Sequence, residues 1–224
     1  MIESTLEFYV GWDVGGWNCD KNQKSRDAIV ILDDTLRIVG KPKRGNLRQA
    51  INASTNTREW IASLFRFCGT ESPGPAQVTM AIDTPLGFSD AFRDLADNLR
   101  SVEAVEKSHT NPYLFRYTER YLFERGLKPL SAIKDMIGSQ ATKGMHALAK
   151  FTPKIESCGV WADHNGTLRA LESYPSGSRG APIIRSLLKG HRTLGHPDLN
   201  DARVCALIAY LFASRRSEQY QYFF

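Results

Sequence analysis

The sequence lacks the features that mark secreted, membrane-spanning and zinc-binding proteins. Its four cysteines are scattered as Cys19, Cys68, Cys158 and Cys205, with no Cys-x-x-Cys pair, so a zinc site or a redox pair is not predicted. No apolar run approaches the roughly 18 residues of a membrane span. The first residues do not form a basic stretch followed by an apolar core, as a signal peptide would. We therefore expect a cytoplasmic protein with free thiols and no membrane partner.

The histidines also lack the spacing of metal ligands, and they are His109, His146, His164, His191 and His196. The composition is otherwise ordinary, with 42% hydrophobic and 24% charged residues in a chain of 224. This composition predicts a folded globular protein rather than a disordered one. The net charge of +5 gives weak support for a polyanionic partner.

Apolar segments bounded by turn residues predict a strand, strand, strand, helix, strand order in the first part of the chain. The strands are expected at residues 8–12, 28–32, 36–39 and 78–82, and the helix at 60–68. Short turns between the first three strands predict an antiparallel meander. Further along, residues 160–163 and 167–173 read as a hairpin around Asn165 and Gly166. Pro197 opens an almost wholly apolar last helix at 198–215, which indicates burial against a sheet.

Residues 88–150 are charged and mostly helical in character, with interruptions at Pro112 and Pro129. We interpret them as a helical insertion after the fourth strand rather than as a second domain. The predicted fold class is therefore α/β, with a mixed five-stranded sheet flanked by helices. One domain is expected to span residues 1–224.

Acidic side chains occur where apolar elements end or begin. Asp13 ends the first predicted strand, Asp83 ends the fourth, Glu172 lies in the last, and Asp198 and Asp201 begin the final helix. A carboxylate at the end of an apolar strand is costly unless it is paired or bound to metal. Acids at the ends of adjacent parallel strands can share one ion, and Mg²⁺ prefers oxygen ligands. The acids therefore predict a divalent-metal site for phosphodiester hydrolysis.

Each acid also has an ordinary structural interpretation. Asp13, beside two glycines, and Asp83, before a Thr-Pro pair, are both suitable turn residues. Glu172 fits a solvated strand position. Asp198 fits a helix N-cap, with Asp201 supporting the first turn. The stronger indication of a metal site is that all five acidic residues occur, in chain order, at the ends of strands and at the start of a helix of one predicted fold.

Several motifs together resemble the predicted nucleases catalogued as domain of unknown function 429. Gly11-Trp12-Asp13 with a following Gly-Gly-Trp is similar to that family, and so is the segment from Ala81 through Asp83-Thr-Pro to Gly87. Further likenesses lie at residues 115–120, 129–131 with 135 and 137–138, 172–175, 200–202 and 205–207. The resemblance therefore covers nearly the whole chain.

The resemblance implies an RNase H-like fold related to RuvC-type resolvases. In that group an acid on the first strand, one on the fourth and one or two on the last helix bind Mg²⁺ or Mn²⁺. By position these are Asp13, Asp83, Asp198 and Asp201, with Glu172 matching the family's glutamate–proline strand end. One departure is that RuvC-type enzymes have a glutamate where this chain has Asp83. The implied partner is a DNA or RNA substrate, although a family label drawn from fold is an analogy.

The insertion leaves the sheet directly after Asp83, so it is expected to border the acidic residues. Within it, Arg116 and Lys134 are interpreted as substrate-binding residues that position a phosphate backbone. Aromatic residues beside Arg116 suit base stacking, and they are Tyr113, Phe115 and Tyr117. The alternative is that these aromatic residues pack the insertion's own small core. Arg116 would then pair with Glu119 three residues later.

Three functions compete. The first is a metal-dependent nuclease. The second is a phosphotransferase or ATPase of the actin and sugar-kinase type, whose first phosphate loop resembles Asp13-Val-Gly-Gly16. Such enzymes, however, need two copies of the core, and this chain has room for one. The third is a catalytically silent binding module. The set of acidic residues argues against it, because a site that only binds phosphate would favour Lys and Arg.

Overall fold

A seven-stranded mixed sheet forms the centre of the molecule in a computed structural model that describes residues 6–72 and 74–214. Its strand order is β3-β2-β1-β4-β7-β6-β5. The central strands β1, β4 and β7 run parallel, whereas every other neighbouring pair is antiparallel. The strands are β1 (Leu6–Asp13), β2 (Asp27–Leu32), β3 (Lys43–Gly45), β4 (Ala76–Asp83), β5 (Lys154–Ser157), β6 (Val160–Ala162) and β7 (Leu168–Glu172).

The α/β class and the mixed sheet are confirmed, but the expected five strands are too few for the described residues. The predicted hairpin forms β6 and β7, turning at Gly166, whose φ of +67° suits glycine. It gains β5 as an added edge strand. The strand predicted at 36–39 is wrong, because Ile38 makes an isolated bridge to Leu32 and the third strand is β3. Leu36 has a φ of +63°, and that conformation interrupts an extended run.

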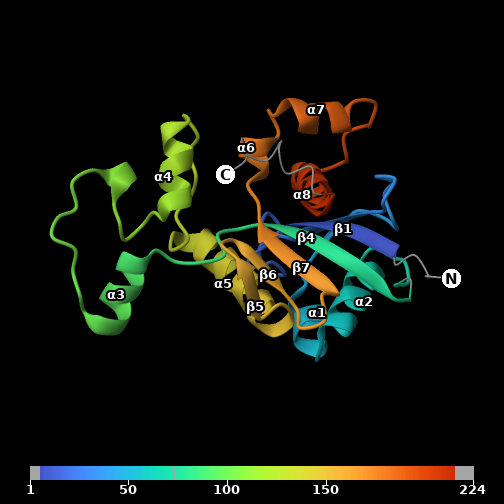
Figure 1. The fold of residues 1–224 in the computed structure, drawn as a ribbon, viewed down its shortest axis with the longest axis horizontal. Coiled ribbons are helices and arrows are strands. Elements are labelled where there is room, and N and C mark those ends of the chain that lie inside the picture. Colours follow the sequence, from blue (N-terminus) through green and yellow to red (C-terminus); the bar gives the residue numbers. More distant parts are fainter. Residues whose placement is uncertain (1–5, 73, 215–224) are drawn as a thin grey trace.

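Helices cover both faces of the sheet (Figure 1). One face packs against α1 (Arg48–Ala53), α2 (Thr57–Phe67) and α5 (Asp135–Phe151), and the other packs against α7 (Pro182–Leu188) and α8 (Pro197–Ala213). A short helix, α6 (Pro175–Ser178), links β7 to α7. The predicted helix at 60–68 is confirmed within α2, whose N-cap Asn56 accepts the Glu59 N–H. The predicted last helix is α8, although Arg215 lies outside the described residues.

The predicted insertion separates into two parts. Its first part, with α3 (Asp90–Asn98), the 3₁₀ turn η1 (Ser108–Thr110) and α4 (Tyr117–Glu124), extends away from the sheet as an arm (Figure 1). Its last part is α5, which belongs to the main core. Ala147, Leu148 and Phe151 of α5 are buried there, and Phe151 stacks on Trp60 at a centroid distance of 5.0 Å.

Among the described residues, no helix is long and apolar enough to cross a membrane.

Candidate functional site

Asp13 and Asp83 lie side by side at the ends of the two central strands. β1 and β4 are parallel and in register, so these residues are direct partners, with about 4.8 Å between the strands. Side chains alternate along a strand. Asp13 therefore shares a face with Gly11 and Tyr9, and Asp83 shares it with Ala81, the face covered by α8. Both carboxyl groups thus point toward the α8 side of the sheet.

A glycine in β1 allows α8 to reach this position. A Cβ atom at Gly11 would lie 1.7 Å from the carbonyl oxygen of Ala202, so any other residue would force the helix away. The close contact brings the first turns of α8 over the strand ends. Asp198 and Asp201 lie in those turns, and His196 is the N-cap, whose Nδ1 accepts the Asp198 N–H. The structure therefore brings four of the five predicted acids to one place.

The two strand-end carboxyl groups hold their protons unusually firmly. Burial, together with the negative charges of Asp83, Asp198 and Asp201, raises the pKa of Asp13 to about 9. Burial also raises the pKa of Asp83 to about 7, assisted by Asp201 and opposed by Arg179. Each carboxylate thus destabilises the ionised form of its neighbours.

Two arginines from other segments neutralise the helix acids. Arg44 of β3 binds Asp198 through Nε and Nη2, at 2.9 and 2.6 Å from Oδ2. Arg179, which follows α6, pairs with Asp201 and is half-exposed. The described residues contain no group of three or more His, Cys, Asp or Glu side chains arranged to hold a metal ion.

The remaining two carboxylates, those of Asp13 and Asp83, are chemically suited to bind an ion such as Mg²⁺. Mg²⁺ commonly keeps several waters and binds through one or two carboxylates together with substrate phosphates. Burial first, and neighbouring carboxylates second, raise the pKa values of Asp13 and Asp83, and a divalent cation between the two would stabilise both ionised carboxylates. The adjacent Thr84 Oγ1 is buried without a hydrogen-bond partner among the described residues. Such orphaned polar atoms are rare in folded proteins, and this one lies one residue from the pair.

Glu172 faces away from this cluster. It is paired in register with Ile82, and it shares a face of β7 with Ala170 and Leu168, whose side chains lie on the α5 side of the sheet. Its carboxylate accepts the Leu86 N–H at 2.8 Å and two bonds from Arg116, at 2.9 and 2.7 Å. Glu172 therefore fastens the start of the arm to the sheet.

The predicted pair between Arg116 and Glu119 is present at the start of α4. The Arg116 guanidinium thus contacts two carboxylates, and its side chain is 16% exposed. Little of it remains open to a substrate phosphate, so these contacts assign it to holding the arm in place. Lys134 lies exposed at the N-cap of α5, and its expected phosphate contact stays a prediction.

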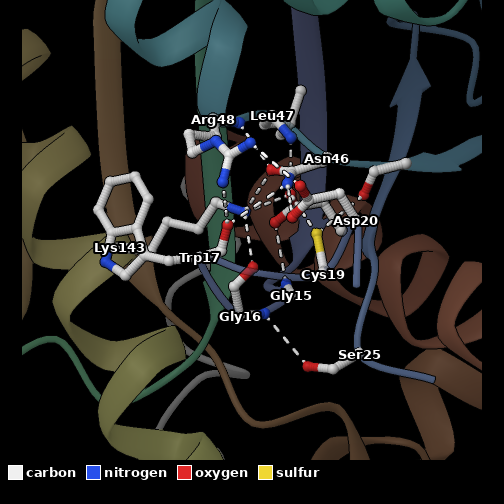
Figure 2. Close-up of polar contacts among 12 residues, drawn as sticks. Gly15, Gly16, Trp17, Cys19, Asp20, Ser25, Asn46, Leu47, Arg48 and Lys143 are labelled. Carbon is white, nitrogen blue, oxygen red and sulfur yellow. Dashed lines mark hydrogen bonds and ion pairs between the residues drawn. The ribbon is translucent and has the colours of Figure 1, made fainter. Parts of the chain in front are cut away.

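Sequence reasoning missed a fully buried ion pair between Asp27 of β2 and Lys143 of α5. Both side chains are 0% exposed. Asp27 also accepts hydrogen bonds from Trp12 Nε1 at 3.0 Å, Gly15 N at 2.9 Å and Leu47 N at 2.8 Å. Figure 2 shows Lys143 extending among the backbone and side chains of this network. The network fixes the loop that follows Asp13.

The same network argues against the phosphotransferase alternative. A phosphate loop needs free backbone N–H groups, but in this loop Gly15 N donates to Asp27, Gly16 N to Ser25 and Trp17 N to Ser139. These three N–H groups are therefore already used within the protein.

Comparison of the chain with protein-family models, with curated proteins and with solved structures finds no match.

The electrostatics of Asp13 and Asp83 predict how stability changes with pH without divalent ions. The pKa of each is raised above its ordinary 3.8 in the folded protein, so their contribution to stability is full below about pH 4. It is lost as pH rises through the folded pKa values of about 7 and 9. The side chain of the Asp13→Asn variant stays neutral at every pH. In the presence of a chelator, this variant is therefore expected to have a higher melting temperature than wild type at pH 9, with a smaller difference at pH 5.

Differential scanning fluorimetry at the two pH values measures this effect. The matched control is Asp34→Asn, an exposed turn residue at the opposite end of β2. A melting difference between Asp13→Asn and wild type that is the same at both pH values would rule out the repulsion described here.

Proposed function

We propose that this chain is an RNase H-like, metal-dependent nuclease that hydrolyses phosphodiester bonds of DNA or RNA. The observation that carries the proposal is the pair of in-register carboxyl groups, Asp13 and Asp83, under the first turns of α8. The antiparallel β1-β2-β3 meander beside the parallel strands β4 and β7 supports the RNase H-like assignment. The resemblance to nucleases of that fold supports it as well, by analogy.

Asp13 and Asp83 would hold Mg²⁺ or Mn²⁺, with Asp198 and Asp201 as neighbouring acids. When bound, such an ion would make an attacking water more acidic and would stabilise negative charge on the leaving oxygen of a phosphodiester. The arginines have a compatible role, because Arg179 is half-exposed and uses one carboxylate partner. Arg44 and Arg179 place positive charge beside the acids, where a polyanionic substrate would otherwise be repelled.

The experiment that tests this function is cleavage of a panel of nucleic acids by the purified protein. The panel contains single- and double-stranded DNA and RNA, an RNA–DNA hybrid and a branched DNA. With millimolar Mn²⁺, at least one form is expected to be cut, and EDTA is expected to stop the cleavage. If Mn²⁺ binds but no form is cut, the chain is a catalytically silent module instead, and the proposal fails.

A further inference from the structure

The arm carries a cavity of about 530 Å³ that has no part in the acidic site. It lies between η1 and α4, and its lining residues are His109, Thr110, Tyr117, Arg120, Tyr121, Phe123 and Glu124. α4 stands apart from the two helical layers that cover the sheet (Figure 1). The cavity is therefore a surface feature of the arm rather than a gap in the core.

The aromatic side chains around this cavity fall into two groups. Phe115 and Phe123, both half-buried, pack edge to face at 5.0 Å, and the exposed His109 lies against Phe123 at 6.3 Å. Tyr117 does not join them. It is 74% exposed, and its ring centroid is 6.3 Å from that of Tyr121. A large ring left open beside a cavity is suited to stacking on a planar ligand.

Positive charge lies beside the exposed ring. Arg120 lines the cavity and is exposed, with no side-chain hydrogen bond or ion pair to the described part of the chain. The Arg125 guanidinium covers one face of Tyr121 at 3.3 Å from the ring centroid. Glu124 is the one acid among the described lining residues. Exposed tyrosine faces with arginines alongside are the combination that binds single-stranded nucleic acid.

The arm is fastened to the sheet close to the acidic residues. Arg116, the N-cap of α4, binds Glu172 at the end of β7, and Glu172 also accepts the Leu86 N–H three residues after Asp83. Tyr117 follows Arg116 directly. The start of α4, with Tyr117, is therefore tied to the end of β7, next to the strand that ends in Asp83.

We propose that this cavity binds one unpaired base of a single-stranded nucleic acid, with Tyr117 stacking on the base and Arg120 holding an adjacent phosphate. The inference rests on the proposed function, because it names single strands as the substrate that the arm presents to the acidic site. A duplex is excluded as the primary ligand because its base faces are already stacked on one another. A base of a duplex becomes available to Tyr117 only after that base has left the stack.

Binding is measured by fluorescence anisotropy in EDTA, with fluorescein-labelled 12-nucleotide oligo(dT) and oligo(U) as probes. Tyr117→Ala is expected to weaken binding about tenfold, within the range for removal of one base–aromatic stack. Tyr117→Phe keeps the ring and should bind nearly as wild type does. Arg120→Ala should weaken binding and reduce the salt slope by about one unit. Arg100→Ala, an exposed arginine of the same insertion outside the cavity, is the matched control.

The outcomes separate this proposal from the proposed function, because the binding assay contains no metal. Equal affinities of wild type and Tyr117→Ala for both probes would overturn the cavity assignment, even if Mn²⁺-dependent cleavage is observed. Tighter binding of a duplex of the same length would overturn it too. A tenfold loss in Tyr117→Ala, together with no Mn²⁺-dependent cleavage, would support the cavity while refuting the nuclease. Unchanged melting temperatures of the exposed-site variants confirm that affinity, rather than folding, has changed.

Discussion

Replacing Lys143 with methionine is expected to lower the free energy of unfolding by about 3–5 kcal/mol, the usual cost of breaking a buried ion pair. Methionine fills a similar volume but leaves the fully buried Asp27 carboxylate without its cation. Total stabilities of domains are about 5–15 kcal/mol, so this single change should remove a large fraction. Lys134→Met, at the exposed N-cap of the same helix, should change stability little.

Urea denaturation measures both variants. The double variant Asp27→Asn, Lys143→Met removes both charges, and it should be more stable than Lys143→Met alone because no unpaired carboxylate remains. If Lys143→Met does not fold, recovery of a folded double variant gives the same information. Additive effects of the two substitutions would contradict coupling between Asp27 and Lys143.

The sequence does contain a signal for this buried lysine. Lys143 precedes the buried residues Ala147 and Phe151 by four and eight positions, so helical periodicity places it on the apolar face of α5. By composition, however, Lys143 is only one of several basic residues in a charged segment, and charged side chains are ordinarily exposed to solvent. Its partner Asp27 begins a buried strand, a position that looks like a turn. Only the packing of α5 against β1 and β2 brings the two together.

The acids at the ends of β1 and β4 were predictable because each ends an apolar run that must be a buried strand. Parallel neighbours then place Asp13 and Asp83 at the same sheet edge. The side on which Glu172 points was not predictable, because each face of β7 carries both an apolar and a charged side chain, with Arg169 on one face and Glu172 on the other, so the strand shows no clean alternation. The pairing of Arg44 with Asp198 across 154 residues depends on the tertiary fold, and no local pattern encodes it.

Asp13→Asn and Asp83→Asn are each expected to lower metal-dependent cleavage by at least about 100-fold. Loss of residues that merely orient metal ligands costs 10–100-fold, so loss of a ligand should cost at least as much. Both substitutions keep the side-chain shape and remove a carboxyl group whose ionised form is disfavoured by burial and by neighbouring carboxylates. The fold should therefore remain intact, and circular dichroism and melting curves check this directly.

A metal site at Asp13 and Asp83 is tested most directly by the Mn²⁺-dependent cleavage rate of the best substrate by four proteins prepared in parallel. These are wild type, Asp13→Asn, Asp83→Asn and the control Asp34→Asn, whose carboxylate is exposed in the turn after β2. Wild type and Asp34→Asn are expected to cut at similar rates, whereas the two strand-end variants are expected to be folded and inactive. Full activity in either Asp13→Asn or Asp83→Asn would contradict a metal site at the paired strand ends.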